Sequence, residues 1–394
     1  MFKKILSAFL TTSLVALSLA GCVPTKAVSG DIAQEETEPE IIDTHSDDGR
    51  TVVGISMPDN LLERWNRDGL FLKKEFEKTG CKVELKYANN LIDTQINDIR
   101  GMIDDGADLL VITAVDGAAL TSILDEAQKA NVKIIAYDRL LMDTDSVDYY
   151  VSFDNYKVGV LQADFLIDKL ALDKEGTEKN IEFVTGDPVD NNARFFYQGA
   201  MDNLKPYIDS GKLKVLSTQT GFYETSTAQW STDIAQQRLQ IILNSYYPKG
   251  TRLDAVLCAN DSTALGAVRA LESDYTGKNT VLVTGQDGDI ANIYNIFEGT
   301  QSMTVYKALQ QESIVAVSLG SALLSGETPA YDLIDNSSWD FECAYNTKDY
   351  NNGIKVVNSY LLQPFTITID NIEKELFDSG YYKRNSAGLI YAVK

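Results

Sequence analysis

A single histidine and four cysteines limit the chemistry open to this chain of 394 residues. The histidine, His45, lies in a polar stretch ahead of the first regular pattern, which excludes Ser-His-Asp and Cys-His nucleophiles and histidine-based metal centres. The cysteines are Cys22, Cys81, Cys258 and Cys343, and no two of them form a CxxC pair. We therefore expect no disulfide framework and no zinc site.

Motifs of nucleotide and acyl-transfer enzymes are also missing. The sequence has no GxSxG, no GxGxxG after a strand and no P-loop, and DGDIAN at 287–292 departs from the EF-hand spacing. A glycosidase needs only two carboxylates, and Asp138 and Asp287 offer such a pair. Because Arg139 and Lys307 would keep both carboxylates ionised, neither suits a general acid. We expect no enzyme, no cofactor and no metal site.

Positive charge is scarce. The chain has 35 lysines and arginines against 57 aspartates and glutamates, a formal net charge of −22. Nucleic acid and anionic lipid headgroups are therefore poor partners. The sequence also lacks a basic helix-turn-helix, which argues against a transcription regulator.

Long apolar runs are absent except at the N-terminus. There, Lys3 and Lys4 precede an apolar stretch, Ile5 to Leu19, that is short for a membrane span. We therefore interpret residues 1–21 as a signal peptide, the alternative being a single transmembrane helix.

The sequence LAGC at 19–22 resembles the bacterial lipobox. This resemblance implies a lipid on Cys22 and an exported, membrane-anchored lipoprotein. Residues 22–50 are acidic and lack helix or strand periodicity, as is typical of a solvated tether.

From Thr51 onward, short β-branched runs alternate with longer segments that place apolar residues three or four positions apart. This pattern predicts an α/β fold with two Rossmann-like lobes, each a parallel sheet covered by helices on both faces. The expected strands are 51–56, 82–87, 108–113, 132–137 and 149–153, then 180–186, 212–218, 253–259, 280–285 and 301–306. A helix at 309–326 and a strand-like segment at 359–369 follow.

Charged and amide side chains stand at the ends of most expected strands. The run KIIAYDR at 133–139, for example, ends in Asp138 and Arg139. Charged side chains are rarely buried without partners, so this ending predicts either a local salt bridge or a polar ligand. In open α/β sheets, ligands bind outside the carboxyl ends of the strands.

These strand-end residues have the chemistry of a sugar site. Asp, Asn and Arg present paired donors or acceptors to neighbouring hydroxyls, and Trp offers a flat apolar face to a sugar ring. The expected ligand-binding residues are Arg64, Trp65, Asp138, Arg139, Asn191, Asn192, Trp230, Asn260, Asp287 and Lys307. Their charges nearly balance, which suits a neutral polyol. We predict that Asp287→Ala or Arg139→Ala abolishes binding and leaves the fold intact.

Several of these residues, and Asp261 beside Asn260, also have a purely structural interpretation. These are helix caps at Asp261 and Asp287, an Arg64–Glu63 ion pair, core packing of Trp65, and a turn and cap at Asn191-Asn192. Separate structural roles would not gather all of these residues at one edge of two sheets. Their convergence favours a binding site.

Several strings carry a more specific resemblance: LERW at 62–65, IIAYDRL at 134–140, SFDNYKVG at 152–159, DPVDNNA at 187–193, LKPYIDSGKL at 204–213, TGQD at 284–287 and GTQSMTVYK at 299–307. With them, residues 51 to about 365 resemble periplasmic sugar-binding proteins of the xylose and multiple-sugar type, within the ribose-binding family. The resemblance implies the periplasmic binding protein type I fold, with two lobes joined by three hinge crossings.

The resemblance also implies a division of the chain and of the site. An N-terminal lobe would contain 51–153 and 307–345, and a C-terminal lobe 154–306 and 353–394. Arg64, Trp65, Asp138 and Arg139 would come from the first lobe, Asn192, Trp230, Asn260 and Asp287 from the second, and Lys307 from a hinge. Residues 332–352 and the tail beyond about 365 depart from the family pattern.

The implied function is that of a monomer that binds a monosaccharide and delivers it to an ABC importer permease. Xylose, glucose, arabinose and galactose are the sugars of relatives with such a site. The alternative is a membrane-tethered sensor that presents the same closed form to a chemoreceptor or a sensor kinase.

Overall fold

The structure, a computed structural model, describes residues 49–393. The expected signal peptide, Cys22 and His45 lie outside these residues. Within residues 49–393, no helix combines the length and the apolarity needed to cross a bilayer.

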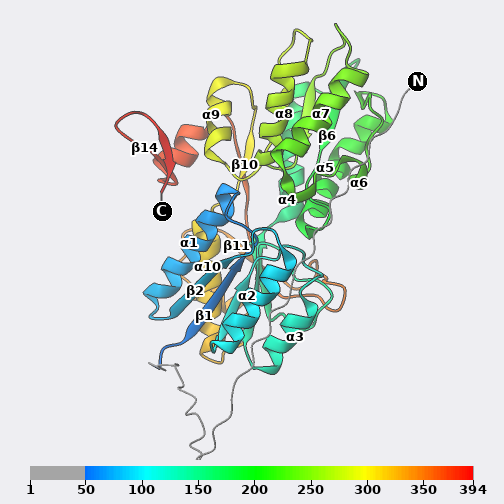
Figure 1. Cartoon of the computed structure of the whole chain (residues 1–394). Helices are drawn as coiled ribbons and strands as arrows, with labels where there is room; N and C mark the ends of the chain where they lie inside the picture. The colour runs from blue at the N-terminus through cyan, green and yellow to red at the C-terminus, as the bar shows by residue number, and fades with distance from the viewer. Residues whose placement is uncertain (1–48, 394) are drawn as a thin grey trace, which may run out of the picture. The chain divides into compact units, whose positions relative to one another are not determined.

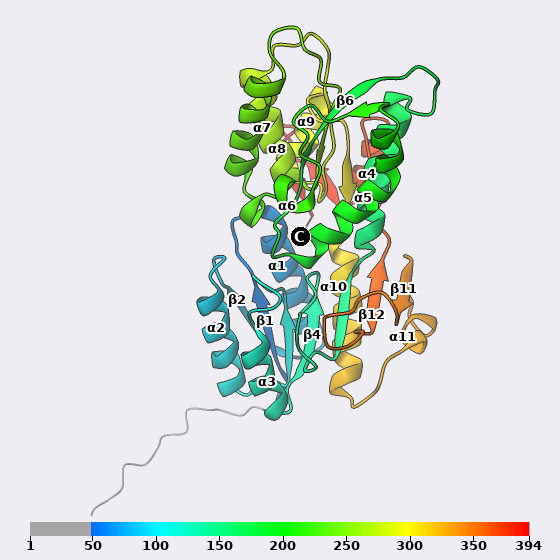
Figure 2. The same cartoon turned by 90° about the vertical axis from the view of Figure 1, so that its right-hand side faces the viewer.

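The first sheet has seven strands in the order β11-β12-β5-β4-β3-β1-β2. They are β1 (Val52–Met57), β2 (Lys82–Tyr87), β3 (Leu109–Ile112), β4 (Lys133–Tyr137), β5 (Tyr149–Phe153), β11 (Cys343–Asn346) and β12 (Ser359–Leu362). All neighbours pair in parallel except β11, which runs antiparallel to β12. Figure 2 shows β11 and β12 towards one edge of this sheet and β2 at the other.

Helices cover both faces of the first sheet. They are α1 (Glu63–Lys78) and α10 (Leu309–Leu324) on one face, and α2 (Ile92–Asp104) and α3 (Thr121–Lys129) on the other. Alternate residues of β3 point into the two cores, Leu109 and Val111 towards α1, and Leu110 and Ile112 towards α2. Burial on both faces explains why these strands read as continuous apolar runs.

The second sheet has four parallel strands in the order β7-β6-β8-β9. They are β6 (Lys179–Val184), β7 (Leu213–Lys214), β8 (Ala255–Cys258) and β9 (Leu282–Val283). The covering helices are α4 (Asn155–Leu170) and α5 (Asn191–Asp209) on one face, and α7 (Thr232–Tyr246) and α8 (Asp261–Asp274) on the other. Two short turns, α6 (Phe222–Thr225) and η1 (Ala228–Trp230), connect β7 to α7.

The remaining elements are α9 (Ile290–Glu298), β10 (Thr304–Tyr306), α11 (Tyr331–Asp335), β13 (Phe365–Ile367), η2 (Glu373–Asp378), β14 (Tyr382–Arg384) and β15 (Ile390–Ala392). The chain passes three times between the two groups of elements, after β5, after β10 and after β12. The two parallel sheets and the three crossings confirm the predicted fold class. Figure 1 shows the two groups of elements and the C-terminal hairpin beside α9.

The assignment of residues 353–394 to the C-terminal lobe is wrong for Ser359–Leu362. This strand, β12, is fully buried and pairs in parallel with β5 of the first sheet. β13 pairs instead with β10, antiparallel. The expected single segment at 359–369 is interrupted by Pro364, which has no N–H to donate to a strand ladder. Each half therefore joins a different sheet.

Candidate binding site

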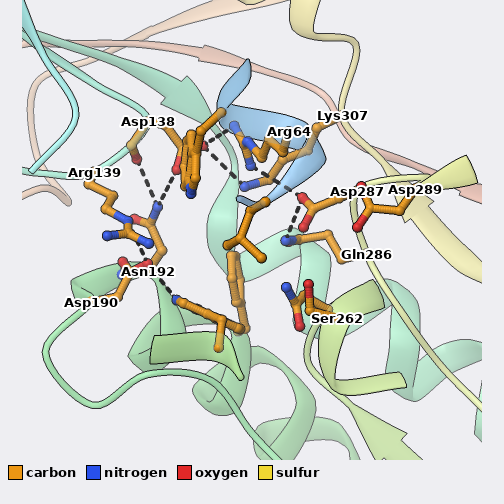
Figure 3. A pocket seen from close by; sticks show the side chains of 15 residues that line it. Arg64, Asp138, Arg139, Asp190, Asn192, Ser262, Gln286, Asp287, Asp289 and Lys307 are labelled. Carbon is orange, nitrogen blue, oxygen red and sulfur yellow. Dashed lines mark hydrogen bonds and ion pairs between the residues drawn. The ribbon is translucent and has the colours of Figure 1, made fainter. Parts of the chain in front are cut away.

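A polar cavity lies where the ends of strands from both groups meet. It is lined by Leu62, Arg64, Trp65, Asp138, Arg139, Asp190, Asn192, Phe196, Trp230, Asn260, Ser262, Gln286, Asp287, Asp289 and Lys307. Nine of the ten expected residues are in this lining, and Asn191 is not. Figure 3 shows Asp138, Arg139 and Asn192 on one side and Gln286, Asp287 and Asp289 on the other.

Asp190, which the sequence interpretation missed, takes the place of Asn191. Asp190 caps α5 by accepting a hydrogen bond from the backbone N–H of Asn192 at 2.9 Å. Its Oδ2 also accepts from Trp230 Nε1 at 3.2 Å and lies 3.0 Å from Arg139 Nε. Asn191 is the first residue of the helix and is half-exposed outside the cavity lining. The available signal was the acid directly before the helix, in DPVDNN.

Arg64 is the centre of the site. It is 6% exposed and stands in the first turn of α1. Its guanidinium donates to Asp68 Oδ2 at 3.1 Å, Asp287 Oδ1 at 3.2 Å and Glu312 Oε2 at 3.3 Å, and also to Asp138 Oδ2 at 2.5 Å. The structural alternative for Arg64, an ion pair with Glu63, is therefore wrong, since the acids that contact Arg64 are buried ones.

Buried acids outnumber the cations around Arg64. Burial raises the pKa of Asp68 to about 6 and the pKa of Glu312 well above its usual value, although Arg64 opposes both shifts. Burial also opposes ionisation of Asp138, but the charges of Arg64 and Lys307 outweigh it and lower the pKa of that carboxyl. Of Asp68, Glu312 and Asp138, the last is therefore the most firmly ionised.

Lys307 is fully buried where the chain leaves β10. Its Nζ lies 3.4 Å from Asp138 Oδ2 and 5.1 Å from the ring centre of Phe196. The second crossing between the sheets thus places a cation against the strand-end acid of β4.

Trp65 packs in the core and also lines the cavity. It is 4% exposed and belongs to the core between the first sheet and α1 and α10, yet it also lines the cavity. The guanidinium carbons of Arg64 and Arg139 lie 4.7 and 5.0 Å from its ring centre. The indole therefore orients two arginines by cation–π contact.

Trp230 lies on the opposite group of elements, and Gly186 makes room for it. A Cβ on Gly186 would lie 2.0 Å from the indole Cη2. Trp230 has a φ of 54° and packs with Phe196, 6.2 Å between ring centres. This close fit fixes the plane of the indole at the cavity wall.

Asn192, at the start of α5, bonds the first group of elements across the cavity. Its Nδ2 donates to the backbone oxygen of Asp138 at 2.7 Å, and its Oδ1 accepts from Tyr150 and Asn155 at 3.1 and 3.0 Å. A fixed amide orientation follows from these opposed partners.

Asp287 and Asn260 complete the second side. Asp287 has a φ of 105° and accepts a hydrogen bond from Gln286 Nε2 at 3.0 Å. Such backbone geometry costs free energy and is concentrated at functional sites. Asn260, and not Asp261 as the structural alternative had it, caps α8 through Thr263 N at 3.0 Å, and it also lines the cavity. Asp261 lies outside the lining and accepts from Gln301 Nε2 at 2.9 Å.

The cavity itself has a volume of about 30 Å³. This is about the volume of one water molecule in the liquid, so the lining side chains must separate before a larger polar ligand enters. Since cross-cavity bonds such as Arg64–Asp287 and Asn192–Asp138 join the two groups of elements, separation of the groups would open the site.

Two α/β lobes, three crossings and a polar cavity between them define a bilobal ligand-binding protein. The chain belongs to the periplasmic binding protein family, whose domain model matches residues 53–328.

The chain is 40% identical over 334 residues to the multiple sugar-binding periplasmic receptor ChvE of Rhizobium radiobacter, covering 84% of this chain and 90% of the relative. It is 36% identical to the D-xylose-binding periplasmic protein of Escherichia coli over 84% of this chain and 91% of the relative. A solute-binding protein of an ABC transporter from Clostridium phytofermentans, solved with bound β-D-glucose, is similar with a TM-score of 0.80 and 44% identity, covering 86% of this chain and 100% of the other.

Proposed function

We propose that this chain binds a monosaccharide between its two lobes and delivers it to an ABC importer. The observation that carries the proposal is the cavity lining, in which Asp, Asn, Arg and Lys side chains from both lobes stand beside two tryptophans. Hydroxyl groups need such paired donors and acceptors, and the C–H face of a sugar ring needs a flat apolar surface.

The ligand class rests on this chemistry and on the relatives. An aldose in its pyranose form, such as glucose or xylose, fits the sugars named for two of the similar proteins. A neutral ligand is further supported because the cations Arg64, Arg139 and Lys307 are already paired with acids. An anionic ligand would have to displace these buried carboxylates.

Binding would work by closure of the lobes. The sugar replaces cross-cavity bonds such as Arg64–Asp287 with bonds to its hydroxyls, and it holds the lobes together through residues of both. A ligand shifts such an equilibrium by the difference in its affinity for the two states. The importer would then recognise the closed arrangement.

An attached lipid at Cys22 and an acidic tether would keep the protein at the membrane surface. The charge of −22 supports the lipid, rather than a basic surface, as the attachment. A sensor that reports sugar to a chemoreceptor or sensor kinase uses the same closed form. Loss of sugar uptake on deletion of the chain supports transport, whereas unchanged uptake with a lost response to sugar supports sensing.

Calorimetric titration tests the proposal. The soluble form, residues 50–394, is titrated with D-xylose, D-glucose, D-galactose, L-arabinose, D-ribose and an oligosaccharide. We expect saturable binding of one or two monosaccharides with no product formed. A folded sample that binds none of them contradicts the proposal, and product formation would show an enzyme instead.

A further inference from the structure

The C-terminal hairpin of β14 and β15 lies beyond residues 53–328, which match the family model. It is built onto the second lobe. Tyr382 and Ile390 pack in one apolar core with Ile293 of α9 and Tyr306 of β10. The backbone N–H of Ile390 also donates to Tyr294 Oη at 2.8 Å. The hairpin therefore moves with α9 and β10.

The other side of the hairpin contacts the first lobe. Arg67 of α1 donates through its NH1 to Tyr382 Oη at 2.7 Å, and its guanidinium carbon lies 5.1 Å from the Tyr382 ring centre. The same hydroxyl donates to the backbone oxygen of Gly288 at 2.5 Å. One buried hydroxyl thus links α1 to the residue next to Asp287, which lines the sugar cavity.

In the closed arrangement, the Arg67 guanidinium depends on Tyr382 for a hydrogen bond. Arg67 is 8% exposed, and within residues 49–393 its Nε and NH2 have no hydrogen-bond partner. Its other charged and polar neighbours are Glu63, with 3.7 Å between NH1 and Oε1, and Tyr306 and Asp289 of the second lobe. A buried guanidinium is costly without partners, so Tyr382 stabilises Arg67 when the lobes are together. When the lobes part, Arg67 regains water.

Further bonds join the same pair of surfaces. Gln311 Nε2 of α10 donates to Tyr381 Oη at 2.8 Å, and the backbone N–H of Ile290 donates to Glu63 Oε2 at 3.1 Å. None of these residues is in the lining of the sugar cavity. The contacts therefore stabilise the closed lobes independently of the ligand.

We propose that Tyr382 and Arg67 form an interlobe latch that positions Gly288 and Asp287 and sets how tightly a sugar is held. The proposal rests on the proposed sugar-binding function. Because the latch exists only in the closed arrangement, it reduces the free energy that the sugar must supply for closure. A contact that stabilises the sugar-bound closed form more than the open form raises the apparent affinity for the sugar.

The test is the substitution Tyr382→Phe in the full chain, with Tyr294→Phe as the matched control. Both variants lose one tyrosine hydroxyl that bonds the backbone, but only Tyr382 also bonds the first lobe. We expect Tyr382→Phe to raise the sugar Kd about tenfold, because hydrogen bonds to charged groups contribute of this order. The control should stay within twofold of the wild type.

Stopped-flow fluorescence separates a latch from a general packing defect. Loss of a closed-state contact should raise the sugar dissociation rate about tenfold and leave the association rate within about twofold, since interface losses act mainly on dissociation. Small-angle scattering at saturating sugar should give the same radius of gyration for both variants and the wild type. In Arg67→Met, the further change Tyr382→Phe should have a smaller effect than in the wild type, because only the bond to Gly288 is then left to lose.

A Kd for Tyr382→Phe within twofold of the wild type refutes the latch, as does an equal change in Tyr294→Phe. If the wild type binds no sugar, the proposed function fails on its own. In that case, the radius of gyration from small-angle scattering without sugar tests the latch separately from sugar binding. Tyr382→Phe must increase the radius of gyration relative to both the wild type and Tyr294→Phe, and equal radii refute it.

Discussion

Arg139→Ala removes the positively charged side chain that follows Asp138 at the end of β4. In the structure, Arg139 NH1 donates to the backbone oxygen of Ala114 at 2.8 Å, its Nε lies 3.0 Å from Asp190 Oδ2, and the guanidinium stacks on Trp65. The Arg139 guanidinium, held in place by these contacts, has further N–H groups that can donate to sugar hydroxyls. Two charge-assisted hydrogen bonds contribute about 1.5–3 kcal/mol each. Their loss should weaken sugar binding about 100-fold or more.

The cost to the fold should be smaller. Asp190 keeps two donors after the substitution, Asn192 N at 2.9 Å and Trp230 Nε1 at 3.2 Å. Burial already raises the pKa of Asp190, so this carboxyl is able to take up a proton when Arg139 is lost. We expect a loss of about 1–3 kcal/mol in the free energy of unfolding.

Calorimetry with the sugar that binds the wild type, together with thermal unfolding, measures both effects. Arg238→Ala is the control, because Arg238 also donates to a backbone oxygen, that of Phe183 at 3.4 Å, but lies outside the cavity lining. Arg139→Lys keeps the charge without the planar fork and should be intermediate. Wild-type affinity in a folded Arg139→Ala would refute the site.

Asp287→Ala should abolish the calorimetric signal and keep a cooperative melt, because the side chain bonds Arg64 at the cavity but packs no core. Gly186→Ala should weaken binding about tenfold, since its Cβ would displace the Trp230 indole, and tryptophan fluorescence would report the shift. Burial raises the pKa of Glu182, so the folded state binds this proton more tightly than the unfolded state. The protonated Glu182 side chain contributes to the free energy of unfolding. This contribution is fully present below pH 4.5, the usual pKa of a glutamate, and is lost as the pH rises through the raised pKa of the folded state. Glu182→Gln should therefore show a smaller fall in Tm than the wild type between about pH 4 and about pH 8.

Much of the fold could be predicted because the main strands are buried on both faces. β1, β3, β4 and β8 read as short apolar runs for this reason. β9 is only two residues long, Leu282–Val283, against an expected 280–285. The C-terminal tail was not predictable from pattern, because β12 and β13 form one apolar segment whose halves pair with β5 and β10 respectively, each more than fifty residues away in sequence.

The site could be predicted to the extent that it lies at strand ends. The sequence predicted Asn191 at the site and missed Asp190. The two residues are adjacent at the start of α5, where neighbouring side chains point in different directions. Asp68 had a weak signal, the i,i+4 spacing from Arg64 on one helix face. Glu312 had none, since only the packing of α10 against α1 brings it to Arg64. That these residues bind sugar stays a prediction.

A crystal structure of the chain with the sugar that calorimetry identifies would show which side chains hold the ligand. We expect one sugar ring between the lobes, with hydroxyls bonded to Asp138, Arg139, Asn192 and Asp287 and with the ring against a tryptophan. A sugar bound elsewhere, or one held by a single lobe while Arg64 keeps its bond to Asp287, would contradict this expectation.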